Sequence, residues 1–347
     1  MRTVVFIFAW LIVLFFTTPL IGVKATPLQA NSIFIVLSYS KGDLCGDPQL
    51  KGILQAINEG PYRFLSIKKY YLDAKHLSQE QVERKAQRVL KAISVVHPKV
   101  VITVDDVAFL KVGLPLNGQK DTFIVFSGIN GDISSYNNIS NFCNGRKPIS
   151  NITGVLEHLF LGEQIDFLNL IKTGPCYLAI LYSTDFMGEK GREQIGNQLK
   201  KLGKEHVVRY FSVSDTKDLV LKAKEINKEA EICAYIPIVL SIYDPAKEKR
   251  VSLDALVPEI TSLIHKIDIA INKTFTKAGF FGGANVDMFH MGYQAGQMAG
   301  MLLDGVEITR LPIEDAARFL IVVNKKRARQ LRITLDPDTL CLIDELI

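Results

Sequence analysis

Apolar and polar residues alternate along the chain in two repeating patterns from residue 33 onward. Short apolar runs, typical of buried strands, lie at 33–39, 64–72, 100–104, 122–129, 177–182, 207–213, 232–240 and 319–323. Amphipathic segments long enough for helices lie between them, at 48–59, 78–95, 162–171, 189–202, 216–228, 253–271 and 288–304. This alternation predicts an α/β fold in which parallel sheets are covered by helices on both faces.

One long polar stretch interrupts the alternation. Residues 129–153 are rich in Asn and Gly and contain no strand-sized apolar run. A stretch of this length inside a compact domain usually marks a boundary or a functional segment. Because the alternation of strands and helices restarts after it, we predict two α/β lobes rather than one wide sheet.

The N-terminal segment reads as a secretory signal peptide. Arg2 precedes an unbroken apolar run at 4–16, and an A-x-A-like cleavage site ends at Ala25, with a second at Ala30. An uncleaved anchor is the alternative, because residues 3–23 approach the roughly 20 residues that a membrane helix needs. Pro19 and Gly22 favour removal of residues 1–25. We therefore expect an exported chain, periplasmic if the source is a Gram-negative bacterium.

Charge and cysteine content narrow the classes of function. The net charge is +5, or +3 once the signal peptide is removed, which is too weak to indicate a nucleic-acid partner. The five cysteines form no CxxC pair and show no metal-ligand spacing. Cys176 and Cys233 lie in or beside apolar runs and are expected to be buried, inert thiols. Cys45 and Cys143 lie in loop-like segments and could pair in an oxidising compartment.

Two glycine-containing motifs favour structural roles. Gly292, Gly296 and Gly300 recur every four residues in GYQAGQMAG, and the polar residues around them predict a soluble helix lying tight against a sheet. The segment FFGGAN, 280–285, lacks the spacing of a phosphate-binding loop and is interpreted as a tight turn. Motifs for a nucleophile with its base, for a zinc helix or for a calcium loop do not occur, so we predict no metal, no cofactor and no enzyme activity.

Two adjacent acids, Asp105 and Asp106, follow the predicted strand 100–104 directly. In α/β sheets ligands bind outside the carboxyl ends of the strands, and these acids lie at such an end. Alternatively, one of them is the N-cap of the helix that starts near Val107. We expect one acid to cap the helix and the other to face a cleft between the lobes.

Other predicted strand ends are also polar, which suggests a cleft lined by polar groups and Tyr rings. The residues at these ends that we select as candidate ligand contacts are Ser38, Tyr39, Ser127, Asn130, Tyr182 and Asp185. Tyr39 and Tyr182 would stack on a flat or apolar ligand, while the acids would fix an amine or a hydroxyl.

The order of several segments resembles the substrate-binding proteins of ABC transporters. These segments are SYSKG, PKVVITVDDVAFL, DTFIVFSGING and SNITGVLEHLFLGEQIDFLNLI, followed by GGANVDMFHMGYQAGQMAGMLLDG and LPIEDAARFLIVVNKKRARQLRITLDPDTL. The resemblance covers essentially all of 33–347. It implies a type I periplasmic-binding-protein-like fold with two Rossmann-like lobes, three crossings between them and a ligand in the cleft.

The resemblance also assigns segments to the lobes. Lobe one would be 31–155 plus 285–310, and lobe two 156–284 plus 311–347, with crossings near 152–156, 282–286 and 311–319. The sequence NVD stands where members of the family often have GVD, which makes Asn285 and Asp287 further candidate ligand contacts.

Three functions are then compatible with the sequence. The first is a monomeric, extracytoplasmic receptor that binds a small solute, such as an amino acid or a related metabolite, and delivers it to an ABC permease. The second is a sensory module that engages a membrane histidine kinase or chemoreceptor. The third, an exported enzyme using Asp105 and Asp106 as an acid and base pair, is the weakest, because no second catalytic group accompanies them.

Overall fold

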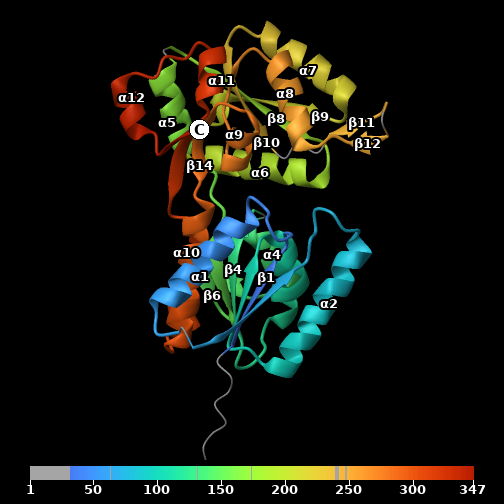
Figure 1. Cartoon of the computed structure of the whole chain (residues 1–347), viewed down its shortest axis with the longest axis vertical. Coiled ribbons are helices and arrows are strands. Elements are labelled where there is room, and N and C mark those ends of the chain that lie inside the picture. Colours follow the sequence, from blue (N-terminus) through green and yellow to red (C-terminus); the bar gives the residue numbers. More distant parts are fainter. Residues whose placement is uncertain (1–31, 63, 131, 173, 239–241, 247) are drawn as a thin grey trace, which may run out of the picture.

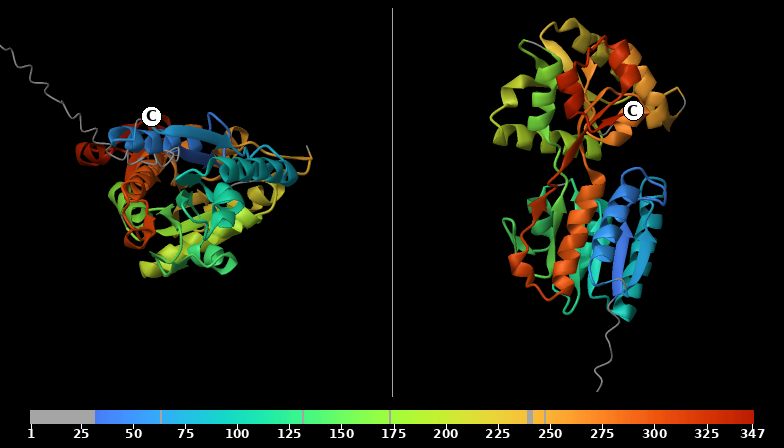
Figure 2. Two further views of the ribbon diagram at one scale, coloured as in Figure 1. Left: turned by 90° about the horizontal axis from the view of Figure 1, so that it is seen from below. Right: turned by 60° about the vertical axis from the view of Figure 1, so that its left-hand side comes forward.

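The computed structural model describes residues 32–347 except 63, 131, 173, 239–241 and 247. The predicted signal peptide and both cleavage sites lie outside the described residues. Within the described part of the chain, no helix is both long and apolar enough to cross a bilayer. The described residues form two α/β lobes stacked along the long axis and joined by a narrow neck (Figure 1, Figure 2), which confirms the predicted fold class.

The first lobe contains a six-stranded sheet. Its strand order is β15-β7-β4-β3-β1-β2, and all neighbouring strands in it are parallel. The strands are β1 (Ser32–Leu37), β2 (Ser66–Tyr71), β3 (Val100–Val104), β4 (Phe123–Ile129), β7 (Ile152–Leu156) and β15 (Glu314–Asp315). Because β1, β3, β4 and β7 are almost entirely buried, they read as continuous apolar runs.

Helices cover both faces of this sheet. One face packs against α1 (Gly46–Glu59) and α10 (Met288–Leu303), and the other against α2 (Gln79–Val96). After β3 the chain forms a short irregular helix that passes from α3 (Asp106–Ala108) through the π-helical Phe109–Gly113 to the 3-10 turn Leu114–Leu116. A polar segment follows β4, with α4 (Ile133–Ile139) and a small hairpin of β5 (Cys143–Asn144) and β6 (Lys147–Pro148).

The evenly spaced glycines of helix α10 face helix α1 and not a sheet. A Cβ added to Gly292 would lie 2.1 Å from the Gln49 carbonyl oxygen, and one added to Gly52 would lie 1.9 Å from that of Phe289. Only residues without a side chain allow the two backbones to approach this closely. The prediction of a tightly packed helix holds, but its glycine face meets another helix.

The second lobe has a four-stranded sheet with the order β13-β10-β8-β9. Its strands are β8 (Tyr177–Ser183), β9 (Val208–Val213), β10 (Ile232–Ile238) and β13 (Ile267–Asp268). One face packs against α5 (Leu161–Ile171), α6 (Phe186–Lys201) and α11 (Lys325–Gln330), and the other against α7 (Thr216–Lys228) and α8 (Leu253–Leu263). The remaining elements are η3 (Glu205–Val207), β11 (Tyr243–Asp244), β12 (Lys249–Arg250), α9 (Lys273–Ala278), η4 (Ile308–Arg310) and α12 (Pro337–Leu342).

Several predicted elements differ from the observed ones. The helix expected at 253–271 ends at Leu263, and β13 follows it. The segment FFGGAN is not a tight turn, because Gly282–Val286 forms strand β14, paired antiparallel with β16 (Phe319–Val323), which in turn pairs with β17 (Glu345–Leu346). Gly282 and Gly283 adopt φ angles of 119° and 149°, which suit glycine, so this strand lacks the usual apolar signature.

Three chain segments cross between the lobes. The first runs from β7 to α5, the second from β14 to α10, and the third from β15 to β16. Strand β15 pairs with β7 in the first sheet, so Glu314–Asp315 belongs with lobe one, although the family resemblance assigned it to lobe two. The buried Gln164 of α5 holds β14 by donating to Ala284 O and accepting from Ala284 N, at 2.5 and 2.9 Å.

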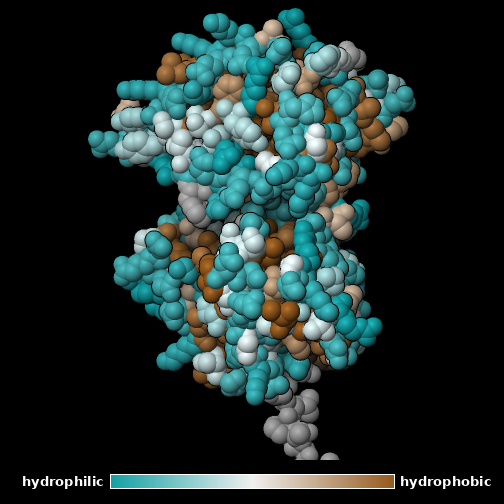
Figure 3. Space-filling model, turned by 180° about the vertical axis from the view of Figure 1, so that it is seen from behind, coloured by the Kyte–Doolittle hydropathy of each residue, from teal (hydrophilic) through white to brown (hydrophobic). Residues whose placement is uncertain are grey.

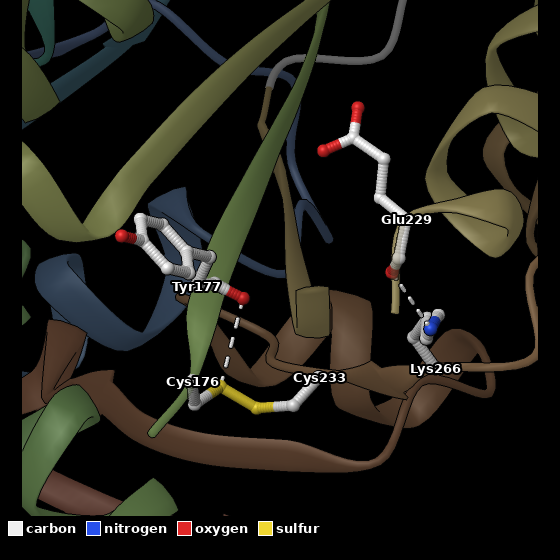
Figure 4. Close-up of a disulfide and its surroundings, with 5 residues drawn as sticks. All are labelled: Cys176, Tyr177, Glu229, Cys233 and Lys266. Atoms are coloured by element: carbon white, nitrogen blue, oxygen red, sulfur yellow. Dashed lines mark hydrogen bonds between the residues drawn. A yellow bond between two sulfur atoms is a disulfide. The ribbon is translucent and has the colours of Figure 1, made fainter. Parts of the chain in front are cut away.

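The cysteines pair differently from the sequence-based expectation. Cys176 and Cys233 form a disulfide with a Cα–Cα distance of 5.3 Å (Figure 4). Cys45 and Cys143 are free. The register between β8 and β10 shifts between Ile232 and Ala234, so Cys233 is the additional residue of a bulge. Sequence spacing does not reveal this bulge, which lies where the two neighbouring inner strands β8 and β10 begin.

Candidate functional site

The strands of the first sheet end at the side of lobe one that faces the second lobe (Figure 1), and polar residues follow several of them. Strands β1, β3 and β4 are parallel neighbours, so their carboxyl ends lie side by side. Tyr39 follows β1, Asp105 and Asp106 follow β3, and Asn130 follows β4. This edge of the sheet brings four of the predicted contacts into one group, which we name the acidic edge.

Asp105 is held in an uncommon conformation at this edge. Its φ angle is 73°, a value that side-chain-bearing residues rarely adopt. The Tyr39 hydroxyl donates to the Asp105 carboxylate, and the Asp105 N–H donates to Ser127 O at 2.8 Å. Backbone strain of this kind is kept where the surrounding structure fixes a residue, and it is common at ligand sites.

Asp106 binds a second set of partners within lobe one. It accepts the Asn130 backbone N–H at 3.1 Å, the Asn130 side-chain amide at 3.2 Å and the Tyr136 hydroxyl at 2.5 Å. Tyr136 comes from α4, in the polar segment after β4, and is not among the contacts predicted from the sequence. Its position in that long polar segment is the one sequence signal that could have pointed to it.

The expected capping role belongs to a different residue. Asp105 occupies the N-cap position of α3 but makes no side-chain cap bond. Instead, Ser38 Oγ accepts the Ala108 N–H at 2.8 Å and donates to Val104 O at 2.9 Å. Ser38, predicted to contact a ligand, is therefore a buried structural link that positions the residues after β3.

Glu157 adds a third carboxyl group to the acidic edge. It begins the first crossing, directly after β7, and the sequence analysis did not select it. Burial, followed by the negative charges of Asp105 and Asp106, raises the pKa of the Glu157 carboxyl to about 8. A Glu directly after a buried strand was the only sequence signal for it.

The same environment shifts the pKa of Asp105. Burial, followed by the charge of Asp106, raises the pKa of the Asp105 carboxyl to about 7, although hydrogen bonds from Tyr39 and Ser38 oppose the shift. Among the described residues, neither Asp105 nor Glu157 takes part in an ion pair. Near neutral pH the acidic edge therefore retains protons that a positively charged group could replace.

The remaining predicted contacts of lobe one are engaged in the interior. Ser127 is fully buried and donates to Gln49 Oε1 at 2.7 Å. Asn285 is fully buried, with its amide bound to Ala270 O and Gly283 O and its oxygen to Thr276. Asp287 caps α10 by accepting the His290 N–H at 3.0 Å. All three support the framework around the neck.

The two candidates in lobe two do not join the acidic edge in this structure. Tyr182 is 8% exposed and belongs to the apolar core of the second lobe. Asp185 caps α6 by accepting the Gly188 N–H at 2.9 Å and pairs with Arg250 at 3.2 Å. Across the described residues, no hydrogen bond or ion pair connects either of them to the acids of lobe one.

A pocket of ≈ 380 Å³ lies between the lobes, beside the acidic edge. Lobe one contributes Asn130, and the first crossing contributes Glu157, while lobe two contributes polar side chains of α6 such as Gln194 and Lys201. Gln194 also donates to Glu157 O at 3.2 Å across the gap. The space-filling view from behind shows the narrow neck between the lobes (Figure 3).

The side chains of the acidic edge suit the binding of a small polar molecule. Carboxyl groups and Tyr hydroxyls bind a molecule that presents N–H or O–H groups, most strongly if it carries a positive charge. Throughout the described ranges, no group of three or more His, Cys, Asp or Glu residues is arranged to hold a metal ion.

Known structures share this two-lobed arrangement at low sequence identity. An ABC domain in complex with L-Trp from Streptococcus pneumonia has a TM-score of 0.64 at 18% identity, covering 91% of this chain and 100% of that one. The ligand-free, open substrate-binding protein CD0873 from Clostridium difficile has a TM-score of 0.71 at 12% identity, covering 91% and 98%. A conserved domain protein from Vibrio cholerae has a TM-score of 0.67 at 14% identity, covering 92% and 100%.

These likenesses establish the type I periplasmic-binding-protein-like fold. Among curated protein sequences, no match is found. The family model described as ABC transporter substrate binding protein matches residues 46–347. This family is extracytoplasmic and of the solute-binding type. Since the match spans most of the chain, the protein belongs to the ABC transporter substrate-binding protein family.

Proposed function

We propose that this protein captures a small molecule with a protonated amine, an amino acid or a related metabolite, between its lobes and delivers it to an ABC permease. The observation that carries the proposal is the acidic edge. Its carboxyl groups converge from the end of β3 and from the first crossing, and burial and mutual repulsion raise the pKa of Asp105 and Glu157. A ligand ammonium group would relieve that repulsion.

The position of the acidic edge supports a ligand that both lobes would contact. It lies at the carboxyl ends of parallel strands, where α/β proteins bind ligands, and beside the pocket between the lobes. Tyr39 is nearly buried, at 8% exposed, and lies beneath Lys75, whose Nζ is 4.6 Å from the ring centroid. The L-Trp complex of the Streptococcus protein makes amino acids the first class to test.

The identity of the ligand is tested by native mass spectrometry of protein purified without refolding. We expect an additional mass that dissociates on denaturation, and we expect the same compound to raise the melting temperature when added back. Absence of any bound compound, together with no thermal shift across amino acids and polyamines, would contradict the proposal.

The role of the acidic edge is tested with Asp106→Asn. This variant removes one charge but keeps the side-chain shape, and we expect about a tenfold or greater loss of affinity, since 1.4 kcal/mol of lost interaction corresponds to one decade. Asp254→Asn, at an exposed position in the first turn of α8, is the matched control and should bind normally. Equal affinities for the two variants would contradict the assignment of the site.

A further inference from the structure

Two of the three crossings run side by side at the neck. Val286, the last residue of β14, pairs with Phe319, the first residue of β16. The Asp287 N–H then donates to Arg318 O at 3.2 Å, just before the chain turns into α10. The third crossing, 316–318, therefore lies against the start of α10.

The side chain of His290 connects these two crossings. Its Nδ1 lies 2.5 Å from Asp287 Oδ2, and its Nε2 lies 2.7 Å from Arg318 Nη1. Because a guanidinium group can only donate, Nε2 must be the acceptor in the second contact. His290 is therefore in the neutral form that carries its proton on Nδ1 and donates it to Asp287.

A second side chain of α10 secures the same crossing. Gln294, one helical turn after His290, donates to Glu314 Oε2 at 2.6 Å and to Asp315 O at 3.2 Å, and accepts the Ala317 N–H at 3.2 Å. The two residues lie on one face of α10, at i and i+4. Together they fix residues 314–318 to lobe one.

The charged and titratable groups around His290 determine which of its contacts would change if Nε2 also gained a proton. Asp287 on its own helix attracts the imidazolium, whereas Arg318 of the third crossing repels it. The Tyr293 ring lies edge-on to the imidazole, with 6.4 Å between the ring centroids, and its hydroxyl donates to Glu59 of α1 at 2.5 Å. Glu314 of β15 is bound by Gln294, one helical turn after His290. Because the His290 side chain is 34% exposed and that of Asp287 only 5%, solvent protons reach the imidazole directly.

We propose that His290 is a protonation-controlled clasp, which holds the Arg318 side chain against α10 when neutral and releases that side chain when protonated. Gln294 and the backbone bond from Asp287 to Arg318 then remain as the links between α10 and the third crossing. Protonated His290 has no acceptor for Arg318 but keeps its contact with Asp287, so the change affects one side of the clasp. Histidine is the side chain whose charge normally changes between about pH 5 and pH 8. The clasp would thereby make movement of the lobes depend on pH.

The consequence for ligand capture rests on the proposed function, whereas the clasp itself can be tested without a ligand. Lobe closure requires backbone rotation in the crossings, so loosening one contact of the third crossing alters the balance of open and closed forms. Failure to find a ligand would leave the clasp measurement intact, and failure of the clasp would leave the ligand site intact.

The test is hydrogen exchange of the ligand-free protein at about pH 5.5 and about pH 8, read from peptides that span 314–319 and corrected for intrinsic exchange. We expect wild-type exchange in this segment to be about tenfold faster at the lower pH, because the local opening there becomes easier. His290→Gln cannot gain a charge and should show the same corrected rate at both values.

Two further variants make the result decisive. Arg318→Gln removes the other half of the clasp at an exposed position and should exchange fast at both pH values, even if His290→Gln fails to fold. His265→Gln changes an exposed histidine of lobe two that contacts Ser262 O and should behave as wild type. Wild-type pH dependence in His290→Gln, or wild-type rates in Arg318→Gln, would overturn the proposal.

Discussion

At the scale of single residues, the acidic edge brings together three carboxyl groups that repel one another when they are ionised in the ligand-free protein. Asp105 is fixed by Tyr39 and by an uncommon backbone conformation, so it cannot turn away from Asp106. Glu157 enters from the first crossing and is affected by both charges. Such an arrangement is unfavourable when all three groups are ionised, and a site of this kind is typical of function rather than of stability.

The raised pKa values predict how stability depends on pH. Unfolded Asp and Glu lose their protons near pH 4, whereas the folded state keeps those of Asp105 and Glu157 up to pKa values of about 7 and about 8. The folded state therefore binds more protons between these limits, so the free energy of unfolding falls as the pH rises from about 4 to 8.

Glu157→Gln should remove part of this fall. At about pH 8 we expect the ligand-free variant to be more stable than the wild type by roughly 1–4 kcal/mol, and near pH 4 about equally stable. Urea denaturation at both pH values measures the difference. A stability difference that is the same at both would mean that the Glu157 carboxyl does not titrate as the site geometry implies.

At the scale of elements, contacts between backbones determine how the neck and lobe one are built. Helices α1 and α10 approach so closely that glycine is required at their contact, and β14 depends on two glycines and on Gln164. These elements carry little apolar signal of their own. Their conformation follows from neighbours that are distant in the sequence.

Gly292→Ala is predicted to destabilise lobe one. Its Cβ would overlap the backbone of Gln49, which can move only if the helices separate, so we expect a loss of roughly 1–3 kcal/mol or more. Gly300→Ala is the milder control, because its Cβ would meet only the Tyr62 side chain, at 3.1 Å. Thermal unfolding that ranks Gly300→Ala as the more damaging change would contradict this packing.

The disulfide between β8 and β10 should contribute to the stability of lobe two. Its cysteines are 57 residues apart, and closing a loop of that length in the unfolded chain stabilises the folded state by about 4 kcal/mol in the chain-entropy estimate. We expect the double variant Cys176→Ser, Cys233→Ser to unfold at a lower urea concentration. Cys341→Ser, at an exposed free thiol, should have no effect, and an unchanged midpoint in the double variant would contradict the prediction.

At the scale of the whole molecule, two lobes joined by three narrow crossings can move as rigid bodies. Few side-chain contacts bridge the gap: Gln194 reaches Glu157 O, and Cys45 Sγ lies 3.7 Å from Thr274 Oγ1. A ligand that contacts both lobes would therefore shift the balance toward a closed form, because it binds that form better.

Small-angle X-ray scattering measures this closure. We expect the compound released from the native protein to reduce the radius of gyration when it is added back, and we expect Asp106→Asn to require about tenfold or more of it. Binding without any change in the radius of gyration would mean that the ligand contacts one lobe alone.

The sequence by itself determined the α/β class, the two lobes and the acids after β3, because buried parallel strands and amphipathic helices leave strong periodic signals. The tertiary structure decided which polar residues meet. It brought Tyr136 to Asp106, and Glu157 close to Asp105. It also placed Ser38, Ser127 and Asn285 in internal hydrogen bonds and paired Cys176 with Cys233. Those outcomes depend on contacts between segments far apart in the chain, where a local pattern carries no information about the partner.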